Sequence, residues 1–158
     1  MSSASSACSL AALLLLAAGC PGDDPPVDPL FPEDYELTYT EVRDCRSGAD
    51  HDLNNVRVLA DPVALAPYMN RTDPFPDGAI LLKEEYDFGD ADCTGNILQW
   101  TVMVRGAEAD DPPELLGWHW QRVNPDRAVL SEDDNRCFDC HSLCGVPPDG
   151  YEGTCTIP

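Results

Sequence analysis

Two cysteines and a histidine stand together near the C-terminal end of the chain, in the sequence CFDCH. Cys137 and Cys140 are separated by two residues and His141 follows directly, although the whole chain contains only three histidines. In an exported protein, two thiols at this spacing can add across the vinyl groups of a haem while the adjacent imidazole ligates the iron. The motif therefore predicts one covalently attached haem c, with His141 as the metal ligand.

The same residues allow other kinds of site. A zinc site could use these residues together with Cys144, but a second close pair of ligands is missing, and an oxidising location disfavours free thiolates. A redox-active dithiol would need a βαβ context, which the sequence does not show. The two cysteines could also belong to a scaffold held only by disulfides. We favour haem over these alternatives because of the features that indicate export.

The first twenty residues have the features of a secretory signal that ends at a lipid-modified cysteine. The apolar run Leu10–Ala18 is too short to cross ~30 Å of hydrocarbon, but it has the length of a signal core. Residues 16–20 (LAAGC) resemble the bacterial lipobox, in which cleavage leaves a lipid on the cysteine, here Cys20. The alternatives are a plain signal peptide or a mis-assigned start, because residues 1–20 contain no Lys or Arg, which a signal sequence usually carries. We expect an exported, periplasm-facing protein that is lipid-anchored to the outer or inner bacterial membrane.

The mature chain divides into a tether and one domain. Residues 21–34 (PGDDPPVDPLFPED) are so rich in proline and aspartate that we expect an extended tether. We expect the folded domain over residues 35–158, a length that suits a single core. The net charge of −20 lies wholly in the mature chain, because residues 1–20 contain no charged side chain. Such an acidic surface repels phosphate backbones, which argues against nucleic acid as a partner.

Several short segments have the alternating or β-branched character of strands, and Pro, Gly and Asp separate them. The expected strands cover residues 55–60, 79–86, 97–105 and 118–123. A short helix is expected over residues 61–69, with Asp61 capping its first turn and Pro62 at its first position. The predicted fold class is mainly β, or α+β: an antiparallel sheet with a few short helices. A C-terminal haem c attachment segment follows, too rich in Cys, Gly and Pro to be regular.

Lys83 stands in the middle of the expected strand 79–86. It is the only lysine of the chain, and the eight other basic residues are arginines. Because side chains alternate between the two faces of a strand, Lys83 shares a face with Leu81. A lysine kept beside apolar neighbours suggests a role specific to its amine. The plainer interpretation is a strand lysine whose ammonium reaches solvent past an apolar stem.

Six cysteines remain for the folded domain, and two of them belong to CFDCH. The other four are Cys45, Cys93, Cys144 and Cys155. An even number in an oxidising compartment predicts two disulfides, and three pairings are open. We favour Cys45–Cys93 within the sheet and Cys144–Cys155 in the tail.

The second axial position of the iron has no obvious ligand in the sequence. Electron carriers usually place a second strong ligand there, often methionine. The candidates are Met69, Met103, His51 and His119. None of them stands in a local pattern that indicates a ligand, so we expect an open iron site.

Several stretches of the chain resemble the cytochrome P-460 family, and they occur in the same order as in that family. Its relatives include cytochrome c-prime-beta. The stretches are VRVLADP (residues 56–62), FPDGAILLKEEYD (75–87), GWHWQRV (117–123) and CFDCH (137–141). The resemblance implies a mainly antiparallel sheet with a few helices, usually in a homodimer. It also implies thioethers at Cys137 and Cys140, with His141 as the proximal ligand. Lys83 stands where the enzymes of this family carry a lysine bonded to the porphyrin edge.

The activity implied by the resemblance is oxidation of hydroxylamine, or of a related small nitrogen species, with an electron-acceptor protein. Relatives without the lysine behave as gas-binding cytochromes. The alternative is therefore a non-enzymatic cytochrome that binds NO or CO, or that transfers electrons. The tail after CFDCH carries extra cysteines that the familiar enzymes do not require.

Oxidation of a nitrogen substrate releases protons, which a carboxylate near the distal face could receive. Glu132, five residues before Cys137, is our candidate for this catalytic role. Glu84 and Glu85 are alternatives. The plainer interpretation of Glu132 is a solvated acid on an acidic surface.

Overall fold

The computed structural model describes residues 26–48, 51–107, 116–145, 150–155 and 158. The predicted signal sequence, the lipid site at Cys20 and the first part of the expected tether lie outside these residues. Within the described ranges, no helix is both long enough and apolar enough to span a membrane.

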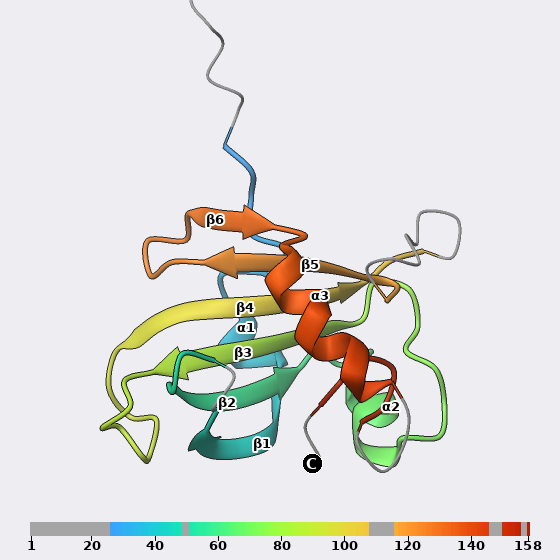
Figure 1. Ribbon diagram of the computed structural model, residues 1–158, viewed down its shortest axis with the longest axis horizontal. Coiled ribbons are helices and arrows are strands. Elements are labelled where there is room, and N and C mark those ends of the chain that lie inside the picture. The colour runs from blue at the N-terminus through green and yellow to red at the C-terminus, as the bar shows by residue number, and fades with distance from the viewer. Residues whose placement is uncertain (1–25, 49–50, 108–115, 146–149, 156–157) are drawn as a thin grey trace, which may run out of the picture.

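Six strands of the described chain form one antiparallel sheet, in which each strand pairs with its neighbours in sequence (Figure 1). The strands are β1 (Thr40–Ser47), β2 (Asn55–Ala60), β3 (Ile80–Tyr86), β4 (Ile97–Arg105), β5 (Trp118–Val123) and β6 (Val129–Glu132). The predicted fold class is confirmed. β2, β4 and β5 have the predicted bounds, and β3 begins one residue later than predicted.

The two strands at the edges of the sheet, β1 and β6, were not predicted. β1 has the sequence TEVRDCRS, of which only Val42 is buried. β6 has four residues, none of them buried. Edge strands are often short and charged, so they carry little of the apolar periodicity by which a strand is recognised.

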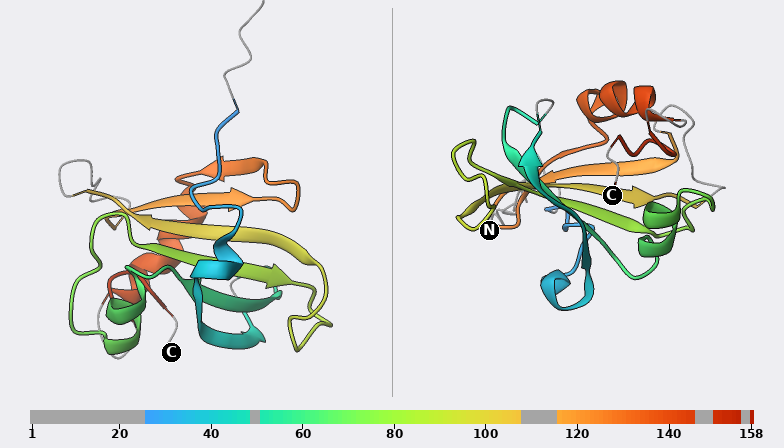
Figure 2. Two further views of the ribbon diagram at one scale, coloured as in Figure 1. Left: turned by 180° about the vertical axis from the view of Figure 1, so that it is seen from behind. Right: turned by 90° about the horizontal axis from the view of Figure 1, so that it is seen from below.

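Within the residues that the structure describes, three short helices and one 3₁₀ turn accompany the sheet. They are α1 (Tyr35–Thr38), α2 (Leu65–Asn70), α3 (Asn135–His141) and the turn η2 (Ser142–Cys144). α3 crosses one face of the sheet, while α1 lies against the opposite face (Figure 2). The helix before β3 was predicted, but Asp61 is not its cap: the N-cap residue is Ala64, without a side-chain cap bond. Asp61 Oδ1 instead accepts a hydrogen bond of 2.7 Å from the Ala64 N–H, in the turn that precedes the helix. The helix itself begins at Leu65, later than predicted.

α3 contradicts the expectation of an irregular C-terminal segment, because CFDCH lies within a helix. The side chain of Asp134 accepts a hydrogen bond from the Arg136 N–H, which satisfies a backbone donor of the first turn. Cys137 and Phe138 pack against the apolar core beneath the helix. This packing and the cap outweigh a composition that is typical of loops.

Each face of the sheet carries its own apolar core. The core under α3 includes Leu81, Met103 and Trp120, and the core under α1 includes Leu82 and Val102. The two sets alternate along β3 and β4, as the pleat of a strand requires. Lys83 therefore lies on the α3 face with Leu81, as predicted.

The packed part of the chain begins before Tyr35, where the domain was expected to start. Phe31 is only 3% exposed and packs with Tyr35 and Trp100. The guanidinium of Arg127 lies 4.3 Å from the centre of the Phe31 ring. The Leu30 N–H also donates a hydrogen bond to the Gln121 side chain. The second half of the expected tether thus belongs to the folded domain, because its aromatic residue completes the core under α1.

Candidate haem-binding site

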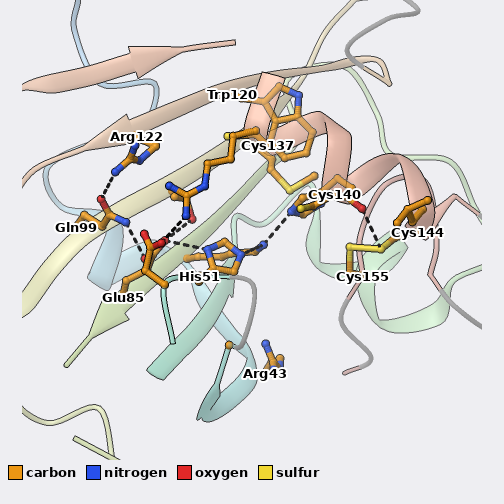
Figure 3. Close-up of a pocket in the computed structure, with 18 of the residues that line it drawn as sticks. Arg43, His51, Glu85, Gln99, Trp120, Arg122, Cys137, Cys140, Cys144 and Cys155 are labelled. Carbon is orange, nitrogen blue, oxygen red and sulfur yellow. Dashed lines mark hydrogen bonds and ion pairs between the residues drawn. A yellow bond between two sulfur atoms is a disulfide. The ribbon is translucent and has the colours of Figure 1, made fainter. Parts of the chain in front are cut away.

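A cavity of about 390 Å³ lies between α3 and the sheet. This volume is within the range of small-molecule and cofactor sites. Figure 3 shows the four labelled cysteines at one end of the cavity and Glu85, Gln99 and Arg122 at the other, with His51 between them. The cavity is lined by sheet side chains on one side and by α3 and the C-terminal tail on the other.

His141 lies at the end of α3 and is 6% exposed. Its Nε2 atom faces the amine of Lys83, and both residues line the cavity. Its Nδ1 atom donates a hydrogen bond to the carbonyl of Gly153, so the lone pair of the neutral ring is on Nε2. Burial, and then the charge of Lys83, lower the pKa of His141 to about 2, although the bond to Gly153 opposes this. A neutral imidazole with an available Nε2 is the form that binds a metal.

Cys137 and Cys140 lie one turn or less before His141 and both line the cavity. Among the described residues, they are the cysteines outside disulfides. Burial raises the pKa of the Cys137 thiol, which keeps it in the protonated form. Because neither sulfur is in a disulfide, both cysteines are available to form thioether bonds.

The other four cysteines of the domain form two disulfides in the favoured pairing. They are Cys45–Cys93 and Cys144–Cys155. The second disulfide removes Cys144 from any set of zinc ligands. Since CFDCH contributes no disulfide, the scaffold held only by disulfides is not what the structure shows either.

Lys83 is 7% exposed and its amine lies between two imidazole rings. Nζ is 3.0 Å from Nε2 of His51 and 3.2 Å from Nε2 of His141. A lysine whose ammonium reaches bulk water would not be placed in this way, so the plainer interpretation is wrong. The amine is directed into the cavity, on the side of the predicted iron ligand.

Glu85 is the buried carboxylate that lines this cavity, whereas Asp52, which also lines it, is exposed and paired with Arg136. The Glu85 side chain is fully buried and receives four hydrogen bonds or polar contacts, from His51, Asn54, Gln99 and Thr101, at 2.7 to 3.2 Å. Burial opposes ionisation of Glu85, but the contacts with His51, Gln99 and Asn54 together outweigh it and lower the pKa to about 2. Glu85 is consequently ionised at neutral pH.

Comparison with known families gives a match over residues 32–144 to the family described as Cytochrome P460. The chain belongs to the cytochrome P460 family. A comparison with curated proteins gave no match. Family membership supports a cytochrome that binds haem. The family match covers the sheet, α3 and the whole CFDCH motif, and it ends at Cys144, so the tail lies beyond it.

The residues of this cytochrome P460 domain fit a haem c. The two free thiols and the neutral His141 ring border one cavity, and Met103 and Trp120 add apolar surface to it. The ring of Trp120 meets the His141 ring edge-on at 4.7 Å between centres. Polar groups are gathered at the end near Glu85, so the cavity offers the apolar and polar ends that an amphipathic macrocycle needs.

The structure corrects the prediction of Glu132 as the carboxylate of the cytochrome P460 site. Glu132 is exposed on β6 and accepts a hydrogen bond of 3.0 Å from Gln121, on the α1 face of the sheet. Glu84 also lies on that face, where it binds Tyr35. Nearness to CFDCH in sequence was a poor guide. The useful signal was strand alternation, since Glu85 follows Lys83 by two residues and must share its face.

Of the four candidates for a second axial ligand, His51 and Met103 line the cavity. Met69 is 48% exposed, and His119 lies 3.5 Å from Asp133 at the edge of the sheet. The contact between His51 and Glu85 was not predicted, because the two residues are 34 positions apart. Gly153 was also missed, since it acts through its backbone carbonyl and no side-chain pattern indicates it.

Proposed function

We propose that this protein is an exported, lipid-anchored cytochrome with one covalent haem c, which oxidises hydroxylamine or a related small nitrogen species. The observation that carries the proposal is the position of the Lys83 amine, 3.2 Å from Nε2 of His141. In the resemblance described above, a lysine at this position marks the hydroxylamine-oxidising members. A buried amine beside the ring nitrogen that would ligate the iron is the arrangement expected of that chemistry.

Three residues of α3 would hold the haem. Cys137 and Cys140 would form the thioethers, and His141 would ligate the iron through Nε2. A haem bound in this way supplies a Lewis-acidic iron and a place for the electrons removed from the substrate. Lys83 would contact the porphyrin edge from the floor of the cavity.

His51 and Glu85 are suited to receive the protons that substrate oxidation releases. His51 Nδ1 lies 3.0 Å from Glu85 Oε1, and because Glu85 is ionised, this nitrogen is the donor. The carboxylate thereby orients the ring and stabilises the imidazolium that forms, and Nε2, which lies 3.0 Å from Nζ of Lys83, would accept the proton once that amine is bonded to the porphyrin edge. The side chain of His51 is 23% exposed, so the proton can pass on to solvent.

The experiment compares haem-loaded wild-type protein with Lys83→Arg. We expect the wild type to show an atypically red-shifted ferrous Soret band, a tryptic peptide that carries haem at Lys83 and steady hydroxylamine turnover with an electron acceptor. All three should be lost in the variant, since arginine keeps the charge but lacks the amine. Arg127→Lys, a similar exchange far from the cavity, is the control.

An ordinary c-type spectrum with unmodified Lys83 and no turnover would overturn the enzymatic proposal. It would favour the non-enzymatic cytochrome that binds NO or CO or transfers electrons. A colourless protein, after export together with haem-attachment machinery, would overturn both.

A further inference from the structure

The hydrogen-bond acceptor of His141 comes from the C-terminal tail, outside the region that matches the cytochrome P460 family. The match ends at Cys144, and the described part of the tail covers residues 150–155. Its Gly153 carbonyl accepts the hydrogen bond from Nδ1 of His141. A segment beyond the family match thus contacts the ring that is proposed to ligate the iron.

Contacts with the core of the domain hold this part of the tail in place. The indole N–H of Trp118 donates a hydrogen bond of 2.8 Å to the Glu152 carbonyl, and the Glu152 carboxylate accepts one of 3.0 Å from the Phe75 N–H. The Gly153 N–H donates to the Cys144 carbonyl at 3.2 Å. Residues on both sides of the His141 contact are therefore anchored.

The backbone of the tail forms a tight turn at Gly153. The N–H groups of Tyr151 and Thr154 each donate to the carbonyl of the other residue, at 3.0 and 2.8 Å. Gly153 has a φ of 82°, a conformation that glycine adopts without strain. The direction of the Gly153 carbonyl is thus set by the turn.

The disulfide Cys144–Cys155 closes this arrangement. Cys144 is three residues after His141, and Cys155 is two residues after Gly153. The bond therefore joins the end of the haem-binding segment to the end of the turn that contacts it. Without it, the tail would be held by a few hydrogen bonds and by the packing of Tyr151 against Phe75, and its ordering would cost more conformational entropy.

We propose that the C-terminal tail is a positioning element for the iron ligand. The Cys144–Cys155 disulfide holds the Gly153 carbonyl in place to accept a hydrogen bond from Nδ1 of His141. This hydrogen bond makes Nε2 a stronger electron donor to the iron. A stronger donor stabilises the ferric form and lowers the reduction potential. The inference rests on the proposed function only in requiring that His141 ligates a haem iron, and it does not depend on the substrate.

The test compares two disulfide-free variants of the haem-loaded protein. In Cys144→Ser/Cys155→Ser, we expect the ferric–ferrous equilibrium to shift roughly tenfold toward the ferrous form, as for other losses of a partner of a metal ligand. The iron–histidine stretching frequency of the ferrous protein should fall. Cys45→Ser/Cys93→Ser is the matched control, because that disulfide does not line the cavity. Its potential and frequency should equal those of the wild type.

Unchanged potential and frequency in the tail variant would overturn the inference, as would equal changes in both variants. If the tail variant does not fold, Gly153→Ala provides the same test with the disulfide intact. Its added methyl group meets no atom closer than 3.5 Å, so the strain comes from the φ of 82° and acts on the turn. We expect a smaller shift in the same direction, and no shift would overturn the inference.

The wild-type spectrum separates this inference from the proposed function. A protein without haem, or without an iron–histidine band, contradicts both. A wild-type band that is insensitive to the tail variants contradicts only the role of the tail. A band that responds to the tail in a protein without hydroxylamine turnover supports the role of the tail and contradicts the enzymatic proposal.

Discussion

The amine of Lys83 lies 3.2 Å from Nε2 of His141, although 58 residues separate the two in the chain. Lys83 comes from β3, in the middle of the sheet, and His141 comes from the end of α3, which covers that sheet. The two side chains meet because the helix crosses the face on which the lysine lies. The site is therefore an interface between the sheet and one helix, and changes on that interface should alter the cofactor chemistry.

Removing both thiols of CFDCH should abolish the thioether attachment of the cofactor to α3. In Cys137→Ser/Cys140→Ser, no tryptic peptide of α3 should carry haem, because the hydroxyl group does not add to a vinyl group under these conditions. Mass spectrometry of the digested protein measures this directly. The control is Cys45→Ser/Cys93→Ser, whose α3 peptide should keep its haem. Haem on the α3 peptide of the first variant would contradict the prediction, whereas haem on the Lys83 peptide alone would report the lysine bond.

Glu85→Gln should lower hydroxylamine turnover, whereas Glu132→Gln should leave it unchanged. Glutamine at residue 85 keeps the shape but lacks the charge that orients His51 and stabilises its imidazolium. Proton transfer by a positioned side chain contributes about 10²-fold or more to a rate, so we expect a loss of roughly that size. Steady-state rates of the two variants, at equal haem content, provide the comparison. Equal loss in both variants would contradict the assignment of the cavity carboxylate.

The stability of the protein should fall in acid because of Glu85. Its pKa is about 2 in the folded protein against an ordinary value of 4.5. A carboxylate with a lowered pKa stabilises the fold fully above pH 4.5, and this contribution, about 3 kcal/mol, is lost as the pH falls through 2. Urea unfolding at several pH values between 6 and 2 would show it. A plot of unfolding free energy against pH should be flatter for Glu85→Gln than for the wild type, whereas the plot for Glu132→Gln should match the wild type. Equal slopes for Glu85→Gln and the wild type would contradict the prediction.

Glu84→Gln should destabilise the fold without changing the haem spectrum. Glu84 is fully buried on the α1 face and accepts hydrogen bonds from Tyr35, Tyr86 and Arg57. Burial, and then the nearness of Glu84, raise the pKa of both tyrosines, so their hydroxyl groups stay protonated and donate. Loss of the buried negative charge removes the closer of the two carboxylates that pair with the Arg57 guanidinium and leaves the more distant Glu41, at a cost of about 3 kcal/mol.

Urea unfolding measures the effect of Glu84→Gln, and Glu36→Gln, on an exposed position of α1, is the control. An altered Soret band in Glu84→Gln would show that the two faces of the sheet are coupled. An unchanged unfolding free energy would show that the buried network does not stabilise the fold.

The central strands of the sheet could be predicted from the sequence, but its two edge strands and the helix α3 could not. β2, β4 and β5 are recognisable because runs of β-branched and aromatic residues are a local property of each segment. β1 and β6 are edge strands whose residues are mostly exposed, so their conformation is decided by pairing with a neighbour. α3 depends in the same way on packing of Cys137 and Phe138 against the core.

The sequence by itself predicted haem binding, the four disulfide cysteines and the face of Lys83. Each of these depends on residue types at short spacings: two thiols and an imidazole within five residues, or alternation along one strand. Only the tertiary structure decided that Glu85 and not Glu132 serves the cavity, and that a tail carbonyl contacts His141. Such choices depend on which face of the sheet a helix covers and where a distant segment is anchored. These are long-range packing relationships, and no short pattern in the chain encodes them.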